Sequence, residues 1–154
     1  MLFLMFQLGR DRYVLETGQV EAVLPLLTAK QLPGAPTGVA GAISYRGRPV
    51  PVVDLALLAL GRPAEARLST RIILLRYPSG PGRDDLLGLL VEQAVETIER
   101  DPADFTTSGV EAGMPPYLGP VASDERGLIQ WVRGEALLSP EIRDILFRQL
   151  QAIP

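Results

Sequence analysis

Residues 33–55 read PGAPTGVAGAISYRGRPVPVVDL, and this stretch decides the fold. Small and apolar residues lead up to a Ser44-Tyr45-Arg46-Gly47 break, and an almost fully apolar segment follows it. Two apolar segments joined by a Gly-containing turn predict a β-hairpin. Pro49 and Pro51 alternate in the second strand, and proline cannot donate to a sheet ladder, so both should face an open edge or a bulge. The stretch therefore predicts a hairpin with a shaped edge and Arg46 at its tip.

Short β segments separated by turn residues continue in both directions from this hairpin. An apolar helical turn is expected at 55–60, stopped by Gly61 and Pro63, with a polar connector at 62–69 and a loop at 78–82. About ten strands with turn signals every 8–12 residues indicate a barrel or sandwich. The predicted strands are 2–8, 12–17, 19–25, 38–44, 48–55, 70–75, 86–91, 94–98, 117–122 and 128–132.

One longer helix is predicted at the end of the chain. Ser139 is a good N-cap, Pro140 suits the first helical position, and Glu141 and Asp144 favour the positive end of the helix dipole. The apolar residues at helical spacing form one face, which we expect to pack on a barrel rather than bind a partner. They are Ile142, Ile145, Leu146 and Leu150.

Length, composition and charge narrow the class of protein. A chain of 154 residues, 47% of them apolar, fits one globular domain. The net charge of −3, with scattered rather than clustered arginines, argues against nucleic-acid binding. No stretch reaches the ~18 apolar residues of a membrane helix, and Met1–Phe6 is interpreted as a first strand rather than a signal peptide.

The chain contains neither cysteine nor histidine, which excludes several kinds of chemistry. A disulfide, a thiol nucleophile, a thiolate metal site and a phospho-accepting histidine all need one of these residues. The single lysine, Lys30, has no evident activating neighbour, and no Gly-rich phosphate loop ends in Lys-Ser/Thr. We therefore expect a binding module that is not an enzyme and holds neither a cofactor nor a metal.

The hairpin resembles the signature of CheW-like domains, the scaffold modules that couple bacterial chemoreceptors to the histidine kinase CheA. The family pattern is a G-x-x-N-x-R-G turn followed by x-x-P-x-x-D-L. Here Gly41-Ala-Ile-Ser-Tyr-Arg-Gly47 supplies the turn and Val50-Pro-Val-Val-Asp-Leu55 the strand. Ser44 stands where the family usually has Asn, and its hydroxyl can still cap a turn.

The second half of the chain extends the resemblance in the same order. Segments 87–97, 117–121 and 128–133 are similar to the family's x-G-x-x-V-D-x-V-x-E-V, Y-x-x-G-V/L and L-I-x-L-L-D patterns. Glu92 replaces Asp, Ala94 replaces Val, and Arg133 stands where an acid is common. The resemblance thus covers nearly the whole chain.

This resemblance implies a mainly β fold of two small intertwined five-stranded, SH3-like barrels with a hydrophobic groove between them and a C-terminal helix. A single CheW-like domain over 1–154 is expected, with the first barrel at 1–66, the second at 69–138 and the helix at 139–151. The implied function is a non-catalytic adaptor between a receptor's cytoplasmic helical tip and a CheA-type kinase. Such a protein would be cytoplasmic and recruited to membrane receptor arrays, without inserting in the membrane.

The resemblance also suggests the partner-binding residues. At the hairpin tip they are Arg46 with its neighbours Ser44, Tyr45 and Gly47; elsewhere they are Val20, Val23 and Val95. Val20 and Val23 are expected to be half-buried in a strand along the groove. Arg46 has two readings, a turn arginine paired with Asp54 or Glu21 or a partner-facing guanidinium, and its place at a loop tip favours the second.

Two alternatives stay open. The same scaffold could serve a non-flagellar pathway for surface sensing, pili or cyclic-di-nucleotide output, since Ser44, Ala22 and Arg133 depart from the usual pattern. A carboxylate-based hydrolase on a β-barrel is a more distant alternative. Its candidate acids lie in Gly/Pro-containing connectors without ligand spacing, so we expect solvated loop charges there. These acids are Asp101, Asp104, Glu111, Asp124 and Glu125.

Overall fold

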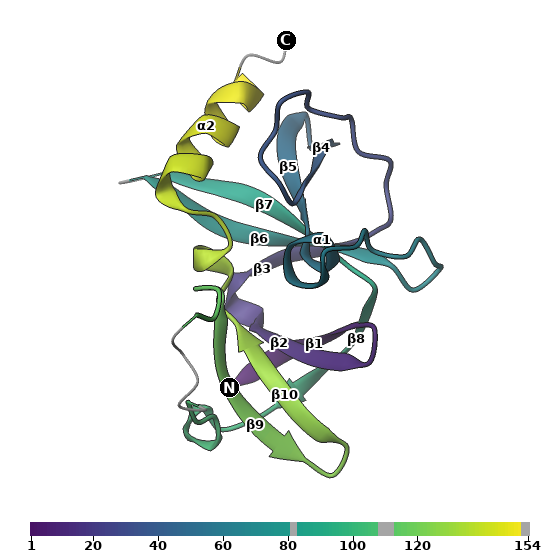
Figure 1. Ribbon diagram of the computed structural model, residues 1–154, viewed down its shortest axis with the longest axis vertical. Helices are drawn as coiled ribbons and strands as arrows, with labels where there is room; N and C mark the ends of the chain where they lie inside the picture. Colours follow the sequence, from purple (N-terminus) through teal and green to yellow (C-terminus); the bar gives the residue numbers. More distant parts are fainter. Residues whose placement is uncertain (81–82, 108–112, 152–154) are drawn as a thin grey trace.

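The computed structural model describes residues 1–80, 83–107 and 113–151, which form two five-stranded sheets (Figure 1). The first sheet has the order β8 (Gln93–Glu99), β1 (Leu2–Leu8), β2 (Asp11–Glu16), β10 (Gly127–Val132), β9 (Leu118–Asp124). The second has the order β3 (Val20–Pro25), β6 (Arg71–Gly80), β7 (Arg83–Val91), β5 (Arg48–Asp54), β4 (Val39–Tyr45). The expected mainly β fold with two five-stranded units is confirmed.

The boundary expected between residues 66 and 69 does not separate the two sheets. The second sheet uses the consecutive strands β3 to β7, whereas the first takes β1 and β2 from one end of the chain and β8 to β10 from the other. The chain crosses between the sheets at a 3₁₀ turn, η1 (Thr17–Gln19), and again between β7 and β8. Parallel pairing of β2 with β10 and of β5 with β7 cannot be read from local patterns, which is why the halves were misplaced.

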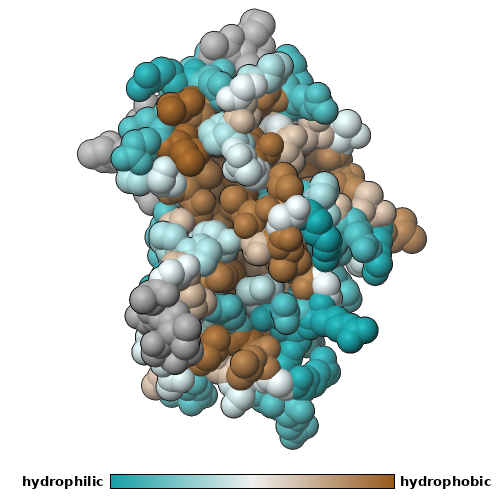
Figure 2. All heavy atoms as spheres, viewed as in Figure 1, coloured by the Kyte–Doolittle hydropathy of each residue, from teal (hydrophilic) through white to brown (hydrophobic). Residues whose placement is uncertain are grey.

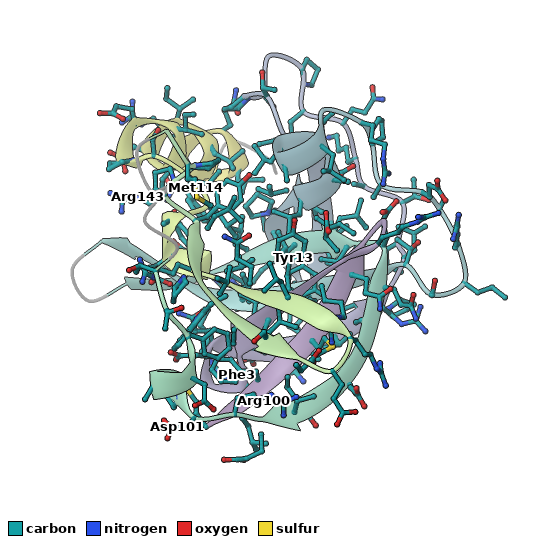
Figure 3. The ribbon with its side chains drawn as sticks, turned by 60° about the horizontal axis from the view of Figure 1, so that its bottom comes forward. Phe3, Tyr13, Arg100, Asp101, Met114 and Arg143 are labelled. Carbon is teal, nitrogen blue, oxygen red and sulfur yellow. The ribbon has the colours of Figure 1, made fainter. Side chains whose placement is uncertain are left out.

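Strands β1 and β2 of the first sheet are buried on both faces, and their successive side chains point to opposite sides. In β1, Phe3 and Met5 enter a small core inside this sheet, while Leu4 and Phe6 enter a larger core shared by both sheets. Figure 3 labels Phe3, which belongs to the small core, and Tyr13, which belongs to the shared core. Trp131 packs edge-on against Phe3 with ring centroids 4.9 Å apart, as expected for a core residue.

The second sheet follows the same rule. In β6, Ile72 and Leu74 enter the core of this sheet, together with Val50 and Val52 of β5. Their neighbours in sequence enter the shared core instead; these are Ile73, Leu75 and Tyr77. The apolar run of β6 is therefore continuous because both of its faces are covered.

The two helices begin and end where the sequence predicts. In α1 (Leu55–Leu60), the Asp54 carboxylate accepts a hydrogen bond from the Leu57 amide at 3.2 Å, and Gly61 ends the helix at φ 72°. In α2 (Pro140–Gln151), the Ser139 hydroxyl caps the Ile142 amide at 3.3 Å.

The apolar face of α2 packs on the β structure, with Leu146 and Leu150 buried. Phe147 stacks on Tyr77 of β6 at a centroid distance of 6.1 Å. The prediction for Ile145 is wrong, because that side chain is 49% exposed. Ile145 lies at the margin of the apolar stripe, whose centre is formed by Leu146 and Leu150.

The loop predicted at 78–82 is also partly wrong. Strand β6 continues to Gly80, with Pro78 opposite Asp84 and Gly80 opposite Arg83, so β6 and β7 form a long hairpin. The register shifts between Pro78 and Gly80, an irregularity at which a sheet accommodates a proline. Residues 81–82 lie outside the described part of the chain. No helix within the described ranges is long and apolar enough to cross a membrane.

Candidate functional site

The tip of the β4–β5 hairpin is a two-residue turn made by Arg46 and Gly47. Their φ angles are 48° and 78°, so both central residues are left-handed, the geometry of a type I′ turn. At Gly47 this conformation carries little cost, because glycine has no Cβ. Arg46 was not expected to share it, although two central residues between paired strands are the signal for this turn type. Among the described residues, Arg46 is the one non-glycine residue with positive φ, so its backbone is strained.

The Arg46 side chain is exposed and lies over the Tyr45 ring, with 5.2 Å from the guanidinium carbon to the ring centroid. Neither of the two acids considered as partners holds it. The Asp54 carboxylate accepts from the amides of Leu57 and Ala64, and Glu21 pairs with Arg76 at 2.8 Å. Within the described residues no salt bridge to Arg46 is found, so its charge faces solvent.

Pro49 and Pro51 lie on the open side of β5, as the sequence predicts. Opposite them in β4 are Ser44 and Ala42, and hydrogen-bonded pairs alternate outward from the two-residue turn, so the proline nitrogens point away from β4. On that other side β7 begins to pair only at Val52. The gap is lined by Arg48, Pro49 and Leu86 and faced by Phe147 and Leu150 of α2; its volume is about 300 Å³.

Of the other predicted site residues, Ser44 and Tyr45 lie beside the tip, whereas the three valines lie elsewhere. Ser44 is exposed and Tyr45 half-buried, both at the end of β4. Val20 is half-buried at the start of β3 and packs on the shared core. The burial predicted for Val23 is wrong: its side chain is 44% exposed, and β3 is an end strand of its sheet. Val95 lies in β8 of the first sheet, and its side chain is outside the described part.

The predicted site residues lie on three strands, β3, β4 and β8, which occupy different places in the two sheets. Strand β4 is at one end of the second sheet, β3 is at its other end, and β8 is an end strand of the first sheet. In the view of Figure 2, apolar surface crosses the middle of the molecule where the two sheets of Figure 1 meet. Any partner that touches all three strands must therefore span both sheets.

Glu92 is a buried acid that the residue pattern did not single out as a contact. Its carboxylate accepts hydrogen bonds from the Gly9 amide at 2.6 Å and the Glu65 amide at 2.9 Å. It also accepts hydrogen bonds from both terminal nitrogens of Arg62, at 2.8 and 3.0 Å. The Arg62 bonds, followed by the Glu65 and Gly9 amides, outweigh burial and lower the pKa of Glu92 to about 2. The one sign of this role in the sequence is that Glu92 directly follows the apolar segment at the end of β7.

We expect Glu92→Gln to lower the free energy of unfolding by about 2 kcal/mol near neutral pH. The pKa of Glu92 is lower in the folded chain, about 2, than its ordinary value of 4.5. Its contribution is therefore complete above the ordinary pKa and is lost as the pH falls through the folded one. Denaturant titrations across this range should show the wild type approaching the variant.

The control for this prediction is Glu125→Gln, which changes an exposed acid in a turn. It should alter the free energy of unfolding by less than ~0.5 kcal/mol at every pH. A deficit in Glu92→Gln that stays constant from neutral to acidic pH would contradict a role for the ionised carboxylate.

Asp124 is not the solvated loop charge that was predicted. It ends β9 and accepts both terminal nitrogens of Arg12, at 2.6 and 2.8 Å, and the Arg126 amide at 2.8 Å. The Arg12 bonds hold the pKa of Asp124 well below its usual range, and the same bonds raise the pKa of Arg12. Nη2 of Arg100, a residue labelled in Figure 3, lies 3.8 Å from Oδ2 of Asp124. The signal that was missed is a buried arginine in β2.

The other acids considered for chemistry stay apart. The Asp101 carboxylate accepts from the Ala103 amide at 2.9 Å and so caps a short 3₁₀ turn, η2 (Pro102–Asp104). Asp104 and Glu125 are exposed, and Glu111 is outside the described residues. In the ranges 1–80, 83–107 and 113–151, no three His, Cys, Asp or Glu side chains are grouped as metal ligands.

Comparison with known proteins defines the class. The model of the CheW-like domain matches residues 2–141. The chain therefore belongs to the CheW-like domain family. It is 24% identical over 140 residues to the chemotaxis protein CheW of Bacillus subtilis (strain 168), covering 90% of this chain and 86% of that protein.

A solved structure shares the fold. The scaffolding protein TtCheW from Thermoanaerobacter tengcongensis superposes with a TM-score of 0.78 at 21% sequence identity. The match covers 90% of this chain and 87% of the solved one. The two-sheet arrangement is thus the fold of a known scaffolding protein.

Proposed function

We propose that this protein is a non-catalytic adaptor that couples the cytoplasmic helical tip of a chemoreceptor to a CheA-type histidine kinase. Support comes from the CheW-like match over residues 2–141 and from relatives named as a chemotaxis protein and a scaffolding protein. An adaptor of this kind works in the cytoplasm and is recruited to membrane receptor arrays. Its partners are proteins, with no nucleic acid and no insertion in the membrane.

The observation that carries the proposal is the exposed, unpaired guanidinium of Arg46 on a strained turn. A non-glycine residue is held in the left-handed region at an energetic cost, and such strain is concentrated at functional positions. The planar guanidinium donates two parallel hydrogen bonds to a carboxylate or to backbone carbonyls. The end of a receptor helix offers such acceptors, so Arg46 is assigned to the receptor contact, with Ser44, Tyr45 and Gly47 around it.

The kinase contact is assigned to end strands of the two sheets. Val23 is exposed on β3, and β8, which carries Val95, ends the first sheet. Strand ends of this kind pair with the edge of another β domain, and their outward side chains supply specificity. Val20, at the start of β3, packs on the core that the two sheets share.

The direct test is a pull-down with the receptor tip and the kinase from the same genome. A ternary complex is expected at micromolar concentrations. Absence of binding to either protein at these concentrations would reject the adaptor function.

We expect Arg46→Ala to weaken binding of the receptor tip by ~1–3 kcal/mol, because a charge-assisted bond is lost. The free energy of unfolding should stay within ~0.5 kcal/mol of the wild type, since the side chain is exposed. Arg46→Lys should restore only part of the affinity, because a point charge cannot replace the two-pronged contact. Calorimetric titration and thermal unfolding measure the two quantities.

The matched control is Arg10→Ala, which removes an exposed arginine from the β1–β2 turn of the other sheet. It makes the same change in net charge and should leave receptor binding unchanged. Arg46→Gly adds a second check, because glycine relieves the positive φ: binding should fall while stability is kept or rises. Equal binding by Arg46→Ala and the wild type would move the receptor contact elsewhere.

A non-flagellar output is the second candidate. Ser44, which exposes its side chain at the tip, departs from the usual family pattern, as do Ala22 and Arg133, and such departures would suit a different set of partners. Binding assays with receptors from flagellar and non-flagellar clusters of the same genome would separate the two outputs.

A further inference from the structure

The second crossing of the chain between the sheets consists of a single residue. Val91 ends β7 of the second sheet, Gln93 begins β8 of the first, and Glu92 alone lies between them. A rotation about the backbone of this residue turns one sheet relative to the other. The orientation of the sheets therefore depends on how firmly Glu92 is held.

Glu92 is held from both sides. Gly9, in the β1–β2 turn of the first sheet, donates its amide to one carboxylate oxygen at 2.6 Å. Arg62 and Glu65, in the connector between α1 and β6, donate to the same carboxylate at 2.8 to 3.0 Å. The Ser69 hydroxyl also donates to the Glu92 carbonyl at 3.3 Å. The Glu92 side chain is only 9% exposed, whereas Arg62 is 41% exposed, so water reaches the bonds from the Arg62 side but not the carboxylate itself.

The other crossing is held less firmly. Beside η1, the Gln19 amide group donates to Glu135 at 2.9 Å, and Arg76 donates to the Gly18 carbonyl at 2.8 Å, both at exposed positions. Exposed bonds of this kind exchange readily with water and constrain an angle weakly.

The shared apolar core keeps the sheets together and restricts their angle through packing, although the hydrophobic effect itself has no direction. Hydrogen bonds to a carboxylate are directional. We propose that Glu92 is a positioning residue that sets the orientation of the two sheets and so shapes the partner surface that both contribute to. The second half of this inference rests on the adaptor function; the first half does not.

The orientation can be measured directly, because a chain without cysteine accepts labels at chosen sites. Ser44→Cys on β4 and Ser123→Cys on β9 place one spin label on each sheet at exposed positions. Pulsed electron–electron double resonance on the full chain should give a narrow distribution of distances between the two labels. Adding Glu92→Gln should shift or widen it, because the amide nitrogen of Gln is a donor that faces other donors.

Asp54→Asn is the matched control. Asp54 holds the same connector through the Ala64 amide at 2.9 Å, but its other bond, to Leu57, also lies on the side of the second sheet. This variant should lose stability and leave the distance distribution unchanged. The contrast separates positioning from general destabilisation.

Arg62→Met serves if Glu92→Gln does not fold, because it removes two of the carboxylate bonds and leaves both backbone donors. It should also widen the distribution. A distribution in folded Glu92→Gln or Arg62→Met that matches the wild type would overturn the inference, as would an equal change in Asp54→Asn.

Binding supplies the second readout. If the competent orientation falls to about a tenth of the population, the Kd for the receptor tip rises about tenfold. The affinities of the wild type and of Arg46→Ala are measured in the same assay for comparison. If the wild type does not bind the receptor tip, the adaptor function is rejected, but the distance measurements still test the orientation of the sheets. A changed distance distribution with unchanged receptor affinity would overturn the link to the partner surface alone.

Discussion

Gly41→Ala is expected to lower the free energy of unfolding by about 3–5 kcal/mol, from overpacking and backbone strain together. A Cβ at this position would lie 2.2 Å from the Lys30 carbonyl oxygen, and the residue has φ 142°. Lys30 cannot withdraw, because its amide and carbonyl each form a 2.8 Å hydrogen bond with Ala42. Denaturant unfolding measures the loss, and hydrogen exchange at Lys30 and Ala42 should accelerate.

Gly18→Ala is the control for this change, since nothing lies within 4 Å of its Cβ. It should change stability by no more than ~0.5 kcal/mol. If both alanine variants unfold at the same denaturant concentration, the close approach of Lys30 to β4 is not rigid.

Asp124→Asn should cost about 3 kcal/mol, because it leaves the Arg12 guanidinium buried without a countercharge. The Arg12 side chain is 8% exposed, whereas Asp124 is 19% exposed and also accepts the Arg126 amide. Arg12→Met should therefore cost less than Asp124→Asn, since the remaining carboxylate keeps a donor and more water. Chemical denaturation of the two single variants and the double variant gives the ordering.

The pH dependence supplies an independent check on this pair. The pKa of Asp124 is lowered on folding, so its contribution is complete above its ordinary value of 3.8 and is lost as the pH falls below it. Asp124→Asn should lose less stability than the wild type over that acidic range. If Arg12→Met lost more stability than Asp124→Asn, it would show that leaving the carboxylate without its partner costs more free energy than leaving the guanidinium without its partner.

Local features of the fold could be predicted because their causes are local. Alternation of apolar residues located the strands, Asp54 and Ser139 marked the helix starts, and Pro49 and Pro51 marked the open side of β5. The tip at Arg46 was also found, although its strained φ was not.

Features that depend on distant segments could not be predicted. The Glu92 carboxylate has partners 27 to 83 residues away, and Asp124 pairs with Arg12 across 112 residues. The sequence around each acid does not reveal which distant groups it contacts. The prediction for Val23 failed for a related reason, because the place of β3 at the end of its sheet cannot be seen in the sequence of β3 itself.

The nested order of the strands has a consequence for how the chain folds as it is made. All strands of the second sheet have been synthesised once Val91 is reached, so that sheet can pair early through mostly short connections. The β1–β2 hairpin is made first, yet its neighbours β8 and β10 come last. Until then both edges of this hairpin lack partners, and they form the part of the nascent chain most open to wrong pairing. Among the described strands, the pair that is made first is therefore among the last to gain all of its neighbours.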